Sequence, residues 1–130
     1  MIFKHKRDKK MFATLHPLLI MIYADLFWYV KSKYNIELVV TSTVSSKLTD
    51  KLLKRTSSSH SEYRALDIRC KDVDVLILND AIEYINNKPE YEQYHYLSNS
   101  GLRRLAYIHT GTAEHIHLSI HKRYANDSIN

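Results

Sequence analysis

The chain has 130 residues, a length that suits one domain built around a single core. Its apolar fraction of 45% and charged fraction of 25% are typical of globular proteins and argue against a disordered chain. The one cysteine, Cys70, excludes an internal disulfide and every zinc site built from several cysteines. Any bound metal would therefore be held by the eight histidines and the acidic residues.

Positive charge is concentrated at the amino terminus. The net charge is +5, and residues 1–13 form a basic arm ahead of a single domain predicted over residues 14–125. The cations of the first ten residues are Lys4, Lys6, Arg7, Lys9 and Lys10. Such an arm can bind nucleic acid or an anionic cell wall, but a solvated, poorly ordered terminus is the commoner state of chain ends. The chain has no aromatic RNA-binding signature and no helix-turn-helix glycine, so no nucleic-acid partner is expected.

Residues 11–30 form an apolar run that has to be distinguished from a signal peptide or a membrane span. Asp25 would lie near the middle of a span, at a cost of about 3 kcal/mol, and the pair His16-Pro17 interrupts the run. No small-residue cleavage site follows it. We therefore expect no signal peptide and no stable membrane insertion, but a buried helix that begins at Pro17. Its inward stripe at helical spacing is Leu19, Ile22, Tyr23, Leu26 and Val30.

The rest of the chain alternates between strand-like and helix-like segments. Four segments have the composition of strands, the second of them short and central: residues 36–44, 65–70, 102–110 and 114–121. Two segments have the spacing of helices: residues 47–55 and 72–86. Residues 91–101 form a tyrosine-rich, irregular connection. The order predicts an α+β domain, with helices on one side of a small, mostly antiparallel sheet.

Histidines alternate along the last predicted strand, in the segment AEHIHLSIH. Residues two apart share a face of a strand, so His115, His117 and His121 would point to the same side. A polar row facing solvent explains such a pattern, and His121 near the strand end suits that interpretation. The alternative is a metal site that two good ligands from an earlier loop and strand start, His60 and Asp67, would complete.

The chemistry of zinc hydrolases explains why such a set of residues would exist. Catalytic zinc uses three protein ligands and keeps a position for water, while a carboxylate that is not a ligand moves the proton. His60, Asp67 and a histidine of the last strand would hold the metal, and Glu114 would be the base. Strand alternation alone does not decide between His115 and His117.

Two motifs resemble those of the D-Ala-D-Ala carboxypeptidase and dipeptidase family of zinc peptidases. That family includes vancomycin-resistance enzymes and bacteriophage endolysins, and it shares its fold with the Hedgehog signalling domain. The first motif, from Ser58 to Asp67, is similar to the family's Ser-x-His-x-x-Gly-x-Ala-x-Asp. The second, from Glu114 to His117, looks like its Glu-x-x-His. Two short motifs in the right order are moderately specific.

The resemblance implies a Hedgehog/DD-peptidase-like fold and a Zn²⁺ ion held by His60, Asp67 and His117, with Glu114 as catalytic base. It implies a zinc metallopeptidase that hydrolyses peptidoglycan stem or cross-link peptides, as a carboxypeptidase or an endopeptidase. Such a protein would be phage-derived. It would stay in the cytoplasm of the infected or host bacterium until it acts on the cell wall, or would be assembled into a virion or its tail.

Two positions depart from the family pattern. Tyr63 stands where the family has glycine, which should change the turn or its packing, and Ser45 stands where a family arginine helps to bind substrate. Four cations could replace that arginine: Lys47, Lys54, Arg55 and Arg64. Ser58 and His115 are expected beside the ligands, where they would orient them. The departures support an alternative function, a catalytically degenerate, zinc-stabilised binding or structural module of the same fold.

Overall fold

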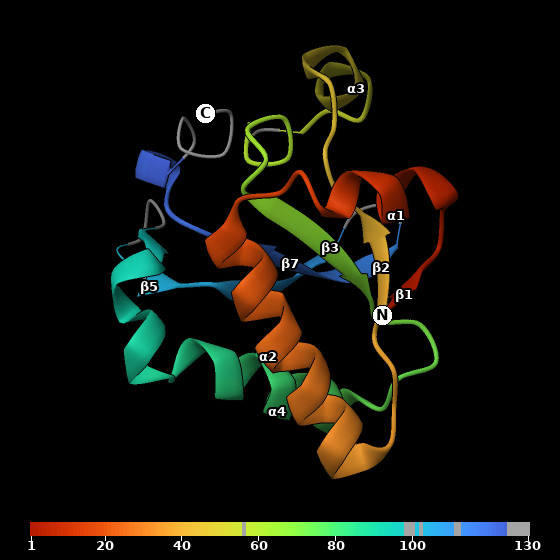
Figure 1. Cartoon of the computed structure of the whole chain (residues 1–130), viewed down its shortest axis with the longest axis vertical. Helices are drawn as coiled ribbons and strands as arrows, with labels where there is room; N and C mark the ends of the chain where they lie inside the picture. Colours follow the sequence, from red (N-terminus) through yellow and green to blue (C-terminus); the bar gives the residue numbers. More distant parts are fainter. Residues whose placement is uncertain (56, 98–100, 102, 111–112, 125–130) are drawn as a thin grey trace.

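A five-stranded mixed sheet with helices packed against it forms the framework of the protein (Figure 1). The computed structural model describes the chain except residues 56, 98–100, 102, 111–112 and 125–130. In spatial order the strands are β1 (Ile2–Phe3), β2 (Val39–Ser42), β3 (Ala65–Arg69), β7 (Glu114–Ser119) and β6 (Ala106–Thr110). Only the β1–β2 pair is parallel; the other three neighbouring pairs are antiparallel. The predicted α+β class is confirmed, and β3 is the central strand.

Two helices, α2 (Pro17–Tyr34) and α4 (Val75–Asn86), pack together over the sheet (Figure 1). The predicted start at Pro17 is confirmed: the ring of His16 precedes the helix and accepts a hydrogen bond from the backbone N–H of Leu18. Asn35 ends α2 in the left-handed conformation, at φ 55°. Asp74 caps α4, its carboxylate accepting from the N–H of Leu76 at 2.8 Å. The helix predicted over residues 72–86 therefore begins three residues later than expected.

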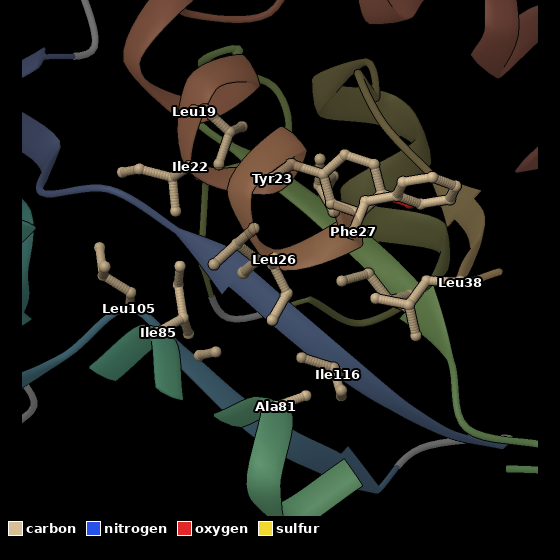
Figure 2. Close-up of a cluster of buried hydrophobic side chains, with 14 of the residues drawn as sticks. Leu19, Ile22, Tyr23, Leu26, Phe27, Leu38, Ala81, Ile85, Leu105 and Ile116 are labelled. Atoms are coloured by element: carbon tan, nitrogen blue, oxygen red, sulfur yellow. The ribbon is translucent and has the colours of Figure 1, made fainter. Parts of the chain in front are cut away.

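The predicted inward stripe of α2 forms the centre of the core. All five of its residues are buried, at 1% exposure or less. Figure 2 shows Leu19, Ile22, Tyr23 and Leu26 in one buried cluster with Ala81 and Ile85 of α4 and Ile116 of β7. Fully burying one leucine or isoleucine side chain contributes about 1.5–3 kcal/mol. Helical periodicity in the sequence predicts these buried positions because α2 is long and its apolar stripe is continuous.

The first thirteen residues are ordered elements of the fold, so the expected poorly ordered terminus is wrong for this segment. Residues of β1 pair with β2, and helix α1 (Lys6–Phe12) follows. Asp8, 5% exposed, accepts hydrogen bonds from the backbone N–H of Thr43 at 3.0 Å and from its hydroxyl at 2.6 Å. Phe12 packs edge-on against Phe3 and Tyr23. These contacts attach the basic segment to the sheet while its lysines remain exposed.

Short elements fill the connections, and several predicted boundaries differ from the structure. The remaining elements are α3 (Lys47–Leu52), the 3₁₀ turns η1 (Pro89–Tyr94) and η2 (Lys122–Tyr124), and a two-stranded ribbon of β4 (Tyr96–Leu97) and β5 (Arg103–Arg104). The strand expected over residues 102–110 is divided into β5 and β6 at fully buried Leu105, whose backbone N–H donates to the side chain of Asn86. The strand expected over residues 36–44 is limited to β2, and the connection expected to be irregular contains η1 and β4.

None of the helices in the described ranges is by itself long and apolar enough to cross a membrane. Helices α1 and α2 meet the length and composition only as a pair, and the chain bends by 118° between them.

A carboxylate of α2, Asp25, joins three elements on the helical side of the fold. It accepts hydrogen bonds from the hydroxyls of Tyr84 at 2.6 Å and Tyr91 at 2.7 Å, and from the ammonium of Lys88 at 2.5 Å. Burial would raise the pKa of Asp25, but the hydrogen bonds from Lys88, Tyr84 and Tyr91 outweigh that effect and lower it. The charged form of Asp25 therefore stabilises the fold.

We expect Asp25→Asn to lower the free energy of unfolding by about 2 kcal/mol at neutral pH, the range for hydrogen bonds to a charged group. The native pKa is depressed, so this contribution is complete above about pH 4, the usual aspartate value. It is lost as the pH falls through the native pKa. Urea titrations of both proteins from pH 7 to pH 3 should show the difference shrinking towards acid. A constant difference would contradict the assignment.

Candidate metal centre

The sheet presents two chemically different faces, and strand alternation separates them. Leu66 and Ile68 of β3 and Ile116 of β7 are completely buried in the core under the helices. Asp67 lies between Leu66 and Ile68, and His117 follows Ile116. Since side chains alternate along a strand, both point to the opposite face. The two residues are direct partners in the antiparallel register of β3 and β7. The register thus places a carboxylate and an imidazole side by side.

A loop residue, His60, completes a buried cluster with this pair. Its Nε2 lies 3.2 Å from Oδ1 of Asp67, and Nδ1 of His117 lies 3.0 Å from the same oxygen. The three side chains offer ligand atoms that all lie within 4.8 Å of one another. Their exposures are 3% for His60, 5% for Asp67 and 9% for His117. The predicted convergence of residues from three parts of the chain is present in the structure.

The hydrogen bonds of His60 show that a cation suits this cluster. Its Nδ1 lies 2.6 Å from the carbonyl oxygen of Thr43. A carbonyl only accepts hydrogen bonds, so Nδ1 carries the proton. In the neutral ring Nε2 is then a bare lone pair directed at the carboxylate of Asp67. Two acceptors at this distance need a positive ion between them, either a second proton or a metal. A histidine whose other N–H donates to a backbone carbonyl is the common arrangement of metal ligands.

Protonation states also favour a metal. Burial lowers the pKa of His117 and so favours its neutral imidazole, although the hydrogen bond with Asp67 opposes the shift. For Asp67, burial would raise the pKa, but hydrogen bonds from His117 and His60, when the nitrogens that face Asp67 carry a proton, outweigh burial and hold it well below the usual range. Neutral imidazole and ionised carboxylate are the forms that bind metals. Two nitrogens and one oxygen suit zinc as well as other divalent transition metals.

Three further residues surround the cluster on the same face. His115, partly exposed, places Nε2 3.5 Å from Oδ1 of Asp67 and so lies beside a ligand, where it was expected. The ring of Tyr107 packs against His117, with centroids 5.3 Å apart. The hydroxyl of Ser59, 1% exposed, lies 3.4 Å from Nε2 of His117. Ser58, which was expected beside the ligands, is instead exposed, and its hydroxyl donates to Glu62.

Of the four candidate cations, Arg55 lies against the cluster. Its Nη2 is 3.8 Å from Oδ2 of Asp67, and its Nη1 is 3.1 Å from Asp50. Arg64 has another task, because it is buried and donates to Glu62 and to the carbonyl of Ile120, which fixes the loop to the end of β7. The sequence offered no way to choose between these arginines, since the choice depends on how the loop after α3 folds back.

The two departures from the family pattern have different structural consequences. Tyr63 has φ 62°, in the left-handed region that glycine adopts freely and other residues adopt at a cost of about 1–2 kcal/mol. The backbone turn is thus one that suits glycine, while the tyrosine ring packs at the margin of the core. Ser45 is buried and donates to Asp50 at 2.5 Å, so its side chain stabilises α3 and is not exposed to a substrate.

Glu114, the predicted catalytic base, does not lie in the cluster. It is exposed at the start of β7, where it pairs with Thr110. Alternation assigns it to the face of Ile116, opposite to that of His117. Its charge acts instead on Cys70: burial chiefly, and then Glu114, raises the pKa of that thiol.

Comparisons of the chain with protein-family models, with curated proteins and with solved structures find no match. Fold and site together define the protein as an α+β protein with a candidate His–Asp–His metal centre on one face of its sheet. Any more particular function has to be inferred from the residues of that centre.

Proposed function

We propose that this chain is a zinc-dependent metallopeptidase that hydrolyses peptidoglycan stem or cross-link peptides. The observation that carries the proposal is the buried convergence of His60, Asp67 and His117, supplied by a loop and two neighbouring strands. The two motifs that contain these residues resemble those of the D-Ala-D-Ala carboxypeptidase family. A phage origin, with action on the wall from the infected cell or from a virion tail, is part of the same proposal.

Each residue near the cluster has a defined role in this proposal. His60, Asp67 and His117 would hold Zn²⁺, which when bound polarises a peptide carbonyl and activates water. Arg55, with its guanidinium near Asp67, would receive a carboxylate of the peptide, because its planar fork matches that group. The resemblance assigns the base to Glu114, which would take a proton from water and pass it to the leaving amine. This role requires its side chain to reach the His117 face around the exposed start of β7.

A second candidate function is a zinc-stabilised binding or structural module without activity. The observation that favours it is the position of Glu114 on the opposite face from His117. In such a module the metal would contribute to folding alone. The hydrogen bond from Ser45 to Asp50 also favours the module, because Ser45 occupies the position of the family arginine and is not a cation.

Substitution of Glu114 separates the two functions. For the peptidase we expect Glu114→Ala to keep bound zinc and to reduce peptidoglycan hydrolysis about 10²–10⁴-fold, the usual contribution of a general base. The measurement is mass spectrometry of digested peptidoglycan together with metal analysis of the protein. Glu83→Ala is the matched control, an exposed glutamate on α4.

The outcomes are distinct. Wild-type protein that binds zinc and releases no peptide fragment supports the module. Full hydrolysis by Glu114→Ala rules out this base while leaving a metal-dependent peptidase in place. Absence of bound metal removes both functions.

A further inference from the structure

In helix α3 the acidic residue Asp50 points inward, while the two leucines are exposed. Asp50 is 8% exposed, whereas Leu48 and Leu52, on the other side of the helix, are 67% and 73% exposed. Leu53, the residue that ends the helix, is 59% exposed. A helix that packs on its own core shows the reverse arrangement. Buried acids and exposed clusters of large apolar side chains are the departures that indicate an interaction surface.

Polar contacts fix this orientation. Asp50 accepts hydrogen bonds from the hydroxyl of Ser45 at 2.5 Å and from the guanidinium of Arg55 at 3.1 Å. The hydroxyl of Ser46 caps the helix by accepting from the N–H of Thr49 at 3.0 Å. The leucines are therefore held outward by the same contacts that hold Asp50 inward, and they do not reach the core by rotation of the helix unless those contacts break.

Lysines surround the exposed leucines. Lys47, Lys51 and Lys54 are all exposed along α3 and its end. Helix α1, with exposed Lys6, Lys9 and Lys10, lies at the same end of the molecule (Figure 1). The hydrogen bonds between Asp8 and Thr43 connect α1 to the segment that enters α3. We call the exposed leucines and lysines of residues 47–54 the leucine–lysine surface.

We propose that the leucine–lysine surface docks on an anionic lipid bilayer. Leucines of a cationic amphipathic segment enter the interface between headgroups and acyl chains, and the flanking lysines interact with anionic headgroups. A nucleic acid or a polyanionic wall polymer would be bound by the lysines and would leave the leucines in water. The combination of both residue types on one short, projecting helix matches a lipid surface. This inference does not depend on the metal centre.

Sedimentation with lipid vesicles tests the proposal in the full chain. We expect binding to vesicles of equal parts phosphatidylglycerol and phosphatidylcholine, and binding at least about tenfold weaker to phosphatidylcholine alone. The double variant Leu48→Ser/Leu52→Ser should bind the anionic vesicles at least about tenfold more weakly. Val75→Ser/Leu76→Ser is the matched control, because these residues of α4 are similarly exposed, at 59% and 73%, and should leave binding unchanged.

Lysine variants and circular dichroism complete the test. Lys47→Gln/Lys51→Gln should also weaken vesicle binding. If the double serine variant loses its native spectrum, the single variant Leu52→Ser decides whether the leucines contribute. Several results would overturn the proposal: no binding to anionic vesicles, or equal loss in the α4 control. Loss with the lysine variant alone would assign the surface to a polyanion. Conversion of a dimer to a monomer by the serine variant, seen by gel filtration, would assign it to a second copy of the chain.

Discussion

Replacing Asp67 with asparagine is expected to weaken zinc binding by at least about a hundredfold. Neighbours that only orient a ligand contribute 10–100-fold to affinity, and Asp67 contacts both histidines of the cluster at 3.0–3.2 Å. The amide keeps the shape of the side chain but removes the one negative charge that faces both imidazoles. Calorimetric titration of the metal-free protein with Zn²⁺ measures the effect, and peptidoglycan hydrolysis should fall with it.

Asp25→Asn is the matched control for this experiment. It also neutralises a hydrogen-bonded carboxylate, but one that lies on the helical side of the fold. We expect it to lower stability and to leave zinc affinity unchanged. Equal zinc affinity in Asp67→Asn and the wild type would show that the cluster is not the metal site.

Removing the metal is expected to lower the melting temperature by about 10 °C. A ligand present at a hundred times its Kd adds about 2.7 kcal/mol to the free energy of unfolding, which for a domain of this size corresponds to that shift. Thermal denaturation with zinc, and again with excess EDTA, provides the comparison. Both candidate functions predict the shift, because each has a buried, metal-bound cluster.

The Asp67→Asn protein tests whether the change in melting temperature comes from metal bound at the cluster. Its melting temperature should be the same with zinc and with EDTA. A shift of the wild-type size in this variant would place the stabilising metal elsewhere in the chain.

Local patterns in the sequence were sufficient to predict the elements that bury a periodic apolar stripe. The start of α2 at Pro17 and its five inward residues are as predicted, since spacing and helix start signals act within a few residues. The amino-terminal segment was not predicted, because its order depends on pairing with β2 and on the contact of Asp8 with Thr43. Composition describes the charge of Lys6 to Lys10 but carries no information about such distant partners.

In the metal centre, too, local patterns predict some features, while others depend on contacts between distant parts of the chain. Strand alternation places His115 and His117 on one face, but the choice of His117 depends on the register that sets it opposite Asp67. Alternation also predicts that Glu114 faces away from His117, and the family motif pointed to the opposite conclusion. Ser59 and Arg55 depend on how the loop before β3 folds, which residue spacing does not reveal.

The pairing of β3 with β7 has a consequence for how the protein folds. If the pairing of β7 with β3 shifted by one residue, Ile116 or Leu118 would lie opposite Asp67, and the imidazole of His117 would point into the hydrophobic core. Only the correct register, in which Asp67 and His117 pair although they are fifty positions apart in the chain, brings the ligand atoms of the candidate metal centre together. In the proposed metal-bound protein the cation would stabilise this register, because its ligands come from both strands.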